Sequence, residues 1–167
     1  MYRNEADMAR VVEETYTVNH TLLAWVRLIG FGALVGVAYW LVTLLIGRYI
    51  IEPLACRDLT SAAICLAPEE LAGKVSAVLV ATAAIFGMIR LRVVRPIIVA
   101  VASAALLWEL SVILSGLFWL ETLAWSVLLY AISYALFGWI ARAWSALIAI
   151  IVAVVVVVVI RIAVMLY

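Results

Sequence analysis

The sequence predicts an all-α fold, a polytopic bundle of membrane-spanning helices, and two observations carry that prediction. Of the 167 residues, 70% are hydrophobic, far above the roughly 45–50% of ordinary globular proteins. From residue 96 to residue 167 only four side chains are charged, namely Glu109, Glu121, Arg142 and Arg161. A soluble domain could not keep such a stretch in water, so we expect its solvent to be lipid.

The chain begins with a polar segment, residues 1–20, which is followed by the first predicted span at about 21–46. Apolar side chains recur at helical spacing in the segment, at Met8, Val11, Val12 and Tyr16. This pattern predicts a short amphipathic helix lying at the cytoplasmic interface, with a frayed terminus as the alternative. No apolar stretch precedes the span, so we expect the span to act as an uncleaved insertion signal.

The second span is predicted at about 73–91, after a polar outer loop at 47–72. Pro68 suits a first helical position, and Glu69 and Glu70 favour the positive end of a helix dipole. A short basic turn is predicted after this span, from Arg90, Arg92, Arg95 and Pro96.

The rest of the chain must hold three further spans. Two spans would be about 35 residues each, which is too long for ordinary tilt. Three fit, at about 97–117, 120–140 and 143–163, with breaks beside Gly116 and Arg142. The sequence therefore predicts five spans that form one transmembrane domain.

The distribution of arginines predicts the orientation. With the N-terminus inside, the inner side holds Arg3, Arg10, Arg90, Arg92, Arg95 and Arg142, and the outer side holds Arg48, Arg57, Lys74 and Arg161. The positive-inside rule therefore favours N-in, C-out. The compact chain and its short loops favour a bacterial inner membrane.

Cys56 and Cys65 are the only cysteines, and both lie in the predicted outer loop. Their spacing excludes a CxxC redox pair and the paired spacing of a zinc site. In an oxidising compartment we expect them to form a structural disulfide, with two free thiols as the alternative. Such a ring of about ten residues would contribute roughly 2–3 kcal/mol.

Glu109 lies about halfway along the third predicted span. A carboxylate there is costly in lipid, by roughly 2.5–3.5 kcal/mol, so we expect it to face protein or water. It is a candidate for a proton or cation pathway; the alternative is a neutral acid bonded to a neighbouring helix. Arg27, Arg48 and Arg161 are expected to snorkel to headgroups, because depth disfavours a pair with Glu109.

Gly32 and Gly36 form a GxxxG pattern in the first span. Missing side chains let helix backbones approach, which predicts close helix packing either within one subunit or between copies. Tyr130, Tyr134 and Phe137 follow i, i+4, i+7 spacing in the fourth span. We interpret this face as core packing, with a quinone or lipid groove as the alternative.

The motifs that usually signal catalysis are missing from the sequence. It holds no Gly-rich phosphate loop, no HExxH and no GxSxG, and its one histidine is His20. We therefore expect no enzymatic activity, no cofactor and no metal site. A net charge of +1 from scattered residues also argues against nucleic-acid binding.

The functional prediction is a small non-enzymatic membrane protein. It would act as a structural or assembly subunit of a homo- or hetero-oligomeric complex, with membrane lipids and other membrane subunits as partners. The main alternative is a small channel or carrier with Glu109 in a proton or cation pathway. An accessory to a lipid or quinone enzyme is a third reading.

Overall fold

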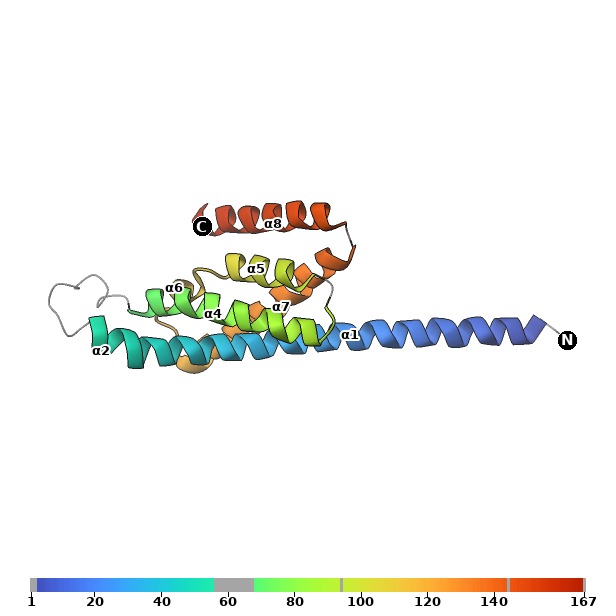
Figure 1. Cartoon of the computed structure of the whole chain (residues 1–167), viewed down its shortest axis with the longest axis horizontal. Coiled ribbons are helices and arrows are strands. Elements are labelled where there is room, and N and C mark those ends of the chain that lie inside the picture. Colours follow the sequence, from blue (N-terminus) through green and yellow to red (C-terminus); the bar gives the residue numbers. More distant parts are fainter. Residues whose placement is uncertain (1–2, 56–67, 94, 144, 167) are drawn as a thin grey trace.

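The computed structural model describes a membrane-type helical bundle (Figure 1). Its backbone is described for residues 3–55, 68–93, 95–143 and 145–166, and its side chains for 22–54, 68–93, 95–142 and 145–163. Within these residues there is no strand, and five helices are long and apolar enough to span a membrane: Leu22–Leu54, Pro68–Arg90, Pro96–Ile113, Trp119–Arg142 and Ala146–Ala163. The predicted fold class and number of spans are confirmed.

The first span belongs to a helix much longer than predicted. α1 (Arg3–Ile46) continues through a π-helical turn, η1 (Gly47–Ile51), into α2 (Glu52–Ala55). The N–H of Glu52 donates to the carbonyl of Gly47, which is the wider π spacing. No proline interrupts residues 3–52, so the polar segment and the span form one helix that projects beyond the bundle (Figure 1). The predicted interfacial position of residues 1–20 stays a prediction.

The second span begins at the residues that signal a helix start in the sequence. α4 (Pro68–Arg90) has Pro68 as its first residue and both Glu69 and Glu70 in its first turn. It therefore starts ahead of the predicted boundary at 73, and the predicted loop 47–72 is helical at both of its ends. α5 (Pro96–Leu106) follows the basic turn and also begins with proline.

The third span is broken, whereas the sequence predicts one uninterrupted helix at about 97–117. α5 ends at Leu106, and a short helix, α6 (Leu110–Ile113), follows it. Leu107 and Glu109 have φ near −100° and ψ of 17°, which are turn conformations. The sequence LLWELSVIL contains neither glycine nor proline, so no local sequence signal marks this break in the helix.

The last two spans are α7 (Trp119–Ala143) and α8 (Ala146–Leu166), close to their predicted positions. Gly116, with φ of +90°, lies in the turn before α7, where a side chain would be strained. α1 and α7 pack along each other, with α4 and α5 beside them, and α8 lies at the edge against α5 and α7 (Figure 1).

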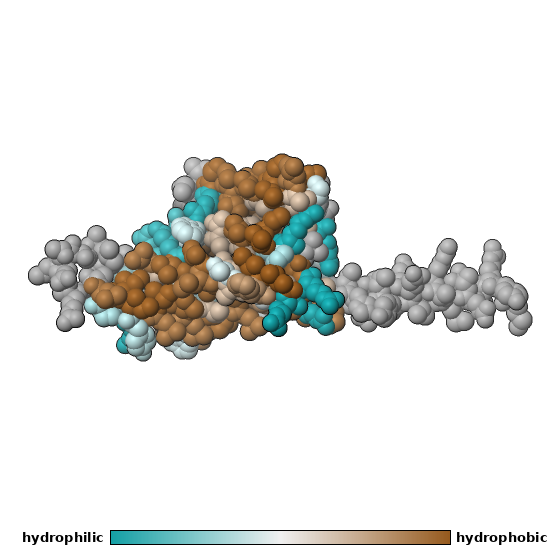
Figure 2. Space-filling model, in the orientation of Figure 1, coloured by the Kyte–Doolittle hydropathy of each residue, from teal (hydrophilic) through white to brown (hydrophobic). Residues whose placement is uncertain are grey.

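Charged side chains gather toward the two ends of the bundle, and hydrophobic surface covers its middle (Figure 2). We call one end the basic end. It holds Arg27, Arg90, Arg92, Arg95 and Arg142, and no acid among the residues whose side chains are described. The opposite end, the mixed end, holds Arg48, Glu52, Glu69, Glu70, Lys74 and Glu121.

Candidate functional site

The glycines of the GxxxG pattern lie against α7 of the same chain. A Cβ at Gly32 would be 2.9 Å from the Cβ of Tyr134. A Cβ at Gly36 would be 2.6 Å from the carbonyl oxygen of Ser126 and 2.7 Å from the Cα of Val127. These glycines therefore let the α1 and α7 backbones touch, so the pattern is used inside the subunit.

Aromatic rings fill the interface that these glycines make narrow. Tyr39 and Tyr130 have ring centroids 5.2 Å apart, Tyr130 and Tyr134 are 6.4 Å apart, and Tyr134 lies 6.0 Å from Phe31. Tyr130, Tyr134 and Phe137 are all at most 3% exposed. The predicted aromatic face thus lies in the core between α1 and α7.

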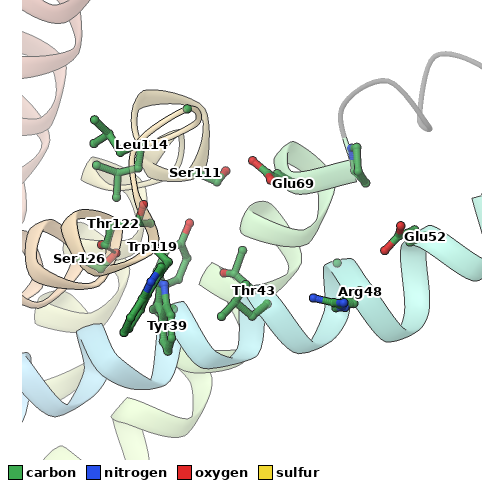
Figure 3. A pocket seen from close by; sticks show the side chains of 16 residues that line it. Tyr39, Thr43, Arg48, Glu52, Glu69, Ser111, Leu114, Trp119, Thr122 and Ser126 are labelled. Atoms are coloured by element: carbon green, nitrogen blue, oxygen red, sulfur yellow. Dashed lines mark hydrogen bonds between the residues drawn. The ribbon is translucent and has the colours of Figure 1, made fainter.

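A cavity of about 520 Å³ opens at the mixed end, between α1, η1, α2, α4, α6 and the start of α7 (Figure 3). We call it the polar cavity because hydroxyl and charged side chains are part of its otherwise largely apolar lining. Its size falls within the range of roughly 300–1,000 Å³ that is usual for ligand pockets. Arg48 lines its outer part and Tyr39 its inner part, and the rise between them along the helix is about 13 Å. In a hydrocarbon core of about 30 Å the cavity therefore reaches near the middle.

Three hydroxyls meet at the inner wall of this polar cavity. Tyr39 and Thr43 point from α1 toward Ser111 of α6 (Figure 3). The Tyr39 hydroxyl lies beside the other two, yet none of the three has a well-formed hydrogen bond among the described residues. Gly73 of α4 makes room for the group, because a Cβ there would overlap Ser111. These hydroxyl oxygens are buried, and a buried hydroxyl without a partner is usually satisfied by a bound water or a polar ligand.

The outer wall of the polar cavity combines charge with aromatic surface. Arg48, Glu52 and Glu69 line it, and Trp40 faces Trp119 with ring centroids 6.3 Å apart (Figure 3). Its remaining hydroxyls bond to carbonyls four residues earlier in the chain: Thr122 donates to Phe118 O, and Ser126 donates to Thr122 O. The cavity can thus hold a polar solute.

Glu109 does not line the polar cavity. It lies at the break between α5 and α6, where it accepts from Arg161 of α8, with 3.4 Å between Oε1 and Nη1. The expectation that depth would keep these residues apart is wrong. The break turns the carboxylate toward α8, and the arginine pairs with it at that level.

The ion pair is loose and only partly covered. Its distance exceeds the roughly 2.7–2.9 Å of a strong charge-assisted bond, and the Glu109 and Arg161 side chains are 47% and 29% exposed. Beside it runs an apolar groove of about 370 Å³, with walls from α5, α6, α7 and α8. This site can attract further charge, and Glu109 and Arg161 are the charged groups among the described residues that line the groove.

Sequence reasoning missed Tyr39, Thr43 and Ser111 as a group. They converge only because the break after α5 brings α6 against α4, and no local signal marks that break. Cys56 and Cys65 lie outside the described residues, so their predicted disulfide stays a prediction. Within the described part of the chain, no cluster of three metal-binding side chains is found.

Comparison of the chain with protein-family models, with curated proteins and with solved structures finds no match.

Proposed function

We propose that this chain is a non-enzymatic integral membrane subunit that assembles with a second copy of itself through the face formed by α5, α6 and α8. The observation that carries the proposal is the Glu109–Arg161 pair, which lies within two spans and is partly exposed. Charged side chains in membrane spans almost always face protein or a water-filled cavity. A pair exposed on the outside of a bundle therefore requires a protein neighbour.

The depth of the pair supports this requirement. Arg161 lies about 22 Å along α8 from Ala146, within a hydrocarbon core of about 30 Å. Arg161 also has unused donors, since a guanidinium carries five N–H groups. A neighbour that supplies carboxylate and guanidinium would satisfy both residues.

A second copy supplies that chemistry. A two-fold interface brings the same patch of both copies together. Two Glu109–Arg161 pairs would then form a ring of alternating charges, each arginine between two carboxylates. α8 is the least covered of the five spans. In its apolar stretch 11% of the residues are buried, whereas 28–39% are buried in the corresponding stretches of the other four spans. The α1 glycines are already occupied by α7, which leaves the α8 face for assembly.

The test is the mass of the purified particle in detergent or nanodiscs, with co-purifying proteins identified. We expect a homodimer that becomes monomeric in the double variant Glu109→Gln/Arg161→Met without unfolding. The matched control is Glu70→Gln/Lys74→Met, which removes an intrahelical pair on α4, a helix that is not part of this face. A monomeric wild type, or equal dissociation in the control, would overturn the proposed interface. Stoichiometric foreign subunits would replace the second copy with another partner.

A small channel or carrier is the second candidate, and the polar cavity favours it. In its most specific form, this candidate function places Glu109 in a proton or cation pathway. Glu109 lines the apolar groove, however, and not the polar cavity. Flux into proteoliposomes that contain Glu109→Gln separates the candidates. Unchanged assembly with lost flux supports the pathway, whereas wild-type flux or no flux in either protein excludes it.

The proposal includes the N-in, C-out orientation and a bacterial inner membrane. The five arginines at the basic end support the orientation through the positive-inside rule. Reporter fusions at both termini test it, because five spans require the two termini to report opposite sides. The compact chain is the support for the inner membrane, and fractionation of the native host tests it.

A further inference from the structure

A small cavity of about 130 Å³ lies at the basic end, where three separate elements meet. Arg27 comes from α1, Arg92 from the turn after α4, and Arg142 from the last turn of α7. We propose that this arginine cavity binds a phosphate group, carried by an anionic lipid headgroup or free in solution. Its volume is roughly four times the ~30 Å³ that a water molecule occupies in the liquid, which suits a small oxyanion.

These three arginines have no acidic partner among the residues whose side chains are described. The ion pairs found there are Glu70–Lys74 and Glu109–Arg161, and both lie elsewhere. Like charges held around one cavity repel each other unless an anion neutralises them. An external anion is therefore the partner that the cavity lacks.

The backbone at Arg92 is left-handed, as it also is at Arg95 of the same turn, which does not line the cavity. Val93 N–H donates to Met88 O and Arg92 N–H donates to Ile89 O, the paired bonds of a Schellman motif. Arg92 occupies the left-handed position of that motif with φ of 55°. Glycine is the usual residue there because it has no Cβ to strain. An arginine at this position costs conformational energy and places a guanidinium at the cavity.

Packed helix ends surround the cavity. Leu28 of α1 packs over Gly138 of α7, where a Cβ would overlap it. The Arg95 guanidinium donates to the carbonyl of Ala141 at 3.3 Å, which ties the turn to the end of α7. The walls of the cavity are thus packed helix ends, and the side chains of Arg27, Arg92 and Arg142 line it as exposed groups.

Phosphate is the anion that this chemistry fits best. Guanidinium groups bind phosphate oxygens through two parallel N–H···O bonds. Trp25 also lines the cavity, and tryptophan favours the headgroup level of a membrane. Anionic lipids at the cytoplasmic surface attract such basic groups. The same contacts would accept inorganic phosphate, so the two sources share one chemistry.

The test measures binding to the full-length chain in neutral detergent, by native mass spectrometry. The probes are phosphatidylglycerol, phosphatidylcholine as the neutral-headgroup lipid, and inorganic phosphate. We expect saturable binding of phosphatidylglycerol, and a loss of affinity of about tenfold or more in Arg27→Gln, Arg92→Gln and Arg142→Gln. The matched control is Arg90→Gln, an exposed arginine of the same end that does not line the cavity.

Each outcome decides the proposal. Equal loss in Arg90→Gln would overturn it and leave a diffuse basic surface, as would binding that does not saturate. Binding of inorganic phosphate with the same variant pattern identifies free phosphate as a ligand, whereas binding of the lipid alone identifies the headgroup. If the glutamine variants misfold, Arg92→Gly serves as the test variant, because glycine adopts the left-handed backbone of this turn without strain. We expect it to keep the wild-type melting temperature and to lose binding.

Discussion

The carbonyl oxygen of Ser126 occupies the space that a side chain at Gly36 would need: a Cβ there would lie 2.6 Å from it. Such a separation is far below contact distance, and the neighbouring atom is backbone, which cannot rotate away. The closeness of α1 and α7 therefore depends on the absence of this one methyl group.

We expect Gly36→Ala to lower the free energy of unfolding by about 1–3 kcal/mol, because the two helices must separate. The matched control is Gly30→Ala, where nothing lies within 4 Å of the new Cβ. That variant should be neutral or more stable by roughly 0.5–1 kcal/mol through helix propensity. Thermal melts in detergent measure both, and equal melting temperatures would contradict the packing described.

The close contact between Gly73 and Ser111 predicts that a substitution at one position can compensate for a substitution at the other. Gly73→Ala should destabilise the protein by about 1–3 kcal/mol, because the new methyl overlaps the Ser111 side chain. Adding Ser111→Gly removes the obstacle, so the double variant should recover most of the loss. Denaturant unfolding of the two single variants and the double variant gives the coupling. Additive losses would show that α6 does not press on α4.

The left-handed backbone at Arg92 predicts that glycine is more stable than alanine at this position. Arg92→Gly should be about 1 kcal/mol more stable than Arg92→Ala, because both lose the guanidinium and only alanine keeps the left-handed strain. Thermal melts of the two variants test this. A more stable alanine variant would show that residue 92 does not adopt the positive φ.

The polar cavity predicts a pattern of cysteine reactivity. With Cys56 and Cys65 replaced by alanine, Thr43→Cys should react with a membrane-impermeant thiol reagent, because Thr43 lines the open cavity. Ser103→Cys should stay unreactive, since Ser103 is fully buried. Labelling followed by mass spectrometry gives both rates. An unreactive Thr43→Cys would mean that the cavity is closed to water.

The native cysteines predict a redox dependence. If the loop that carries Cys56 and Cys65 faces an oxidising compartment, the unreduced protein should resist alkylation at both thiols. Reduction should then lower the free energy of unfolding by about 2–3 kcal/mol. Two alkylated thiols without reduction would favour the opposite orientation.

Several boundaries were predictable because their signals are local. Pro68 begins α4, Pro96 begins α5, and Gly116 lies at the turn before α7. The long α1 was only partly predictable, since Gly47 and the polar residues around it resemble a loop yet remain helical. In the site, Glu109 and Arg161 both stood out as charges in apolar spans, but the sequence did not predict that they pair.

The sequence by itself determined the class of the protein and its number of spans. Hydrophobic length is a local property, and a backbone in lipid has no partner for its N–H and C=O groups except itself. Only the tertiary structure decided which residues meet: Gly36 with Ser126, Tyr39 with Ser111, and Glu109 with Arg161. Lipid-facing and core-facing side chains are mostly apolar here, so apart from the aromatic face of α7 the sequence carries little periodic signal for the rotation of each helix. The packing of the helices sets that rotation, and with it every site described above.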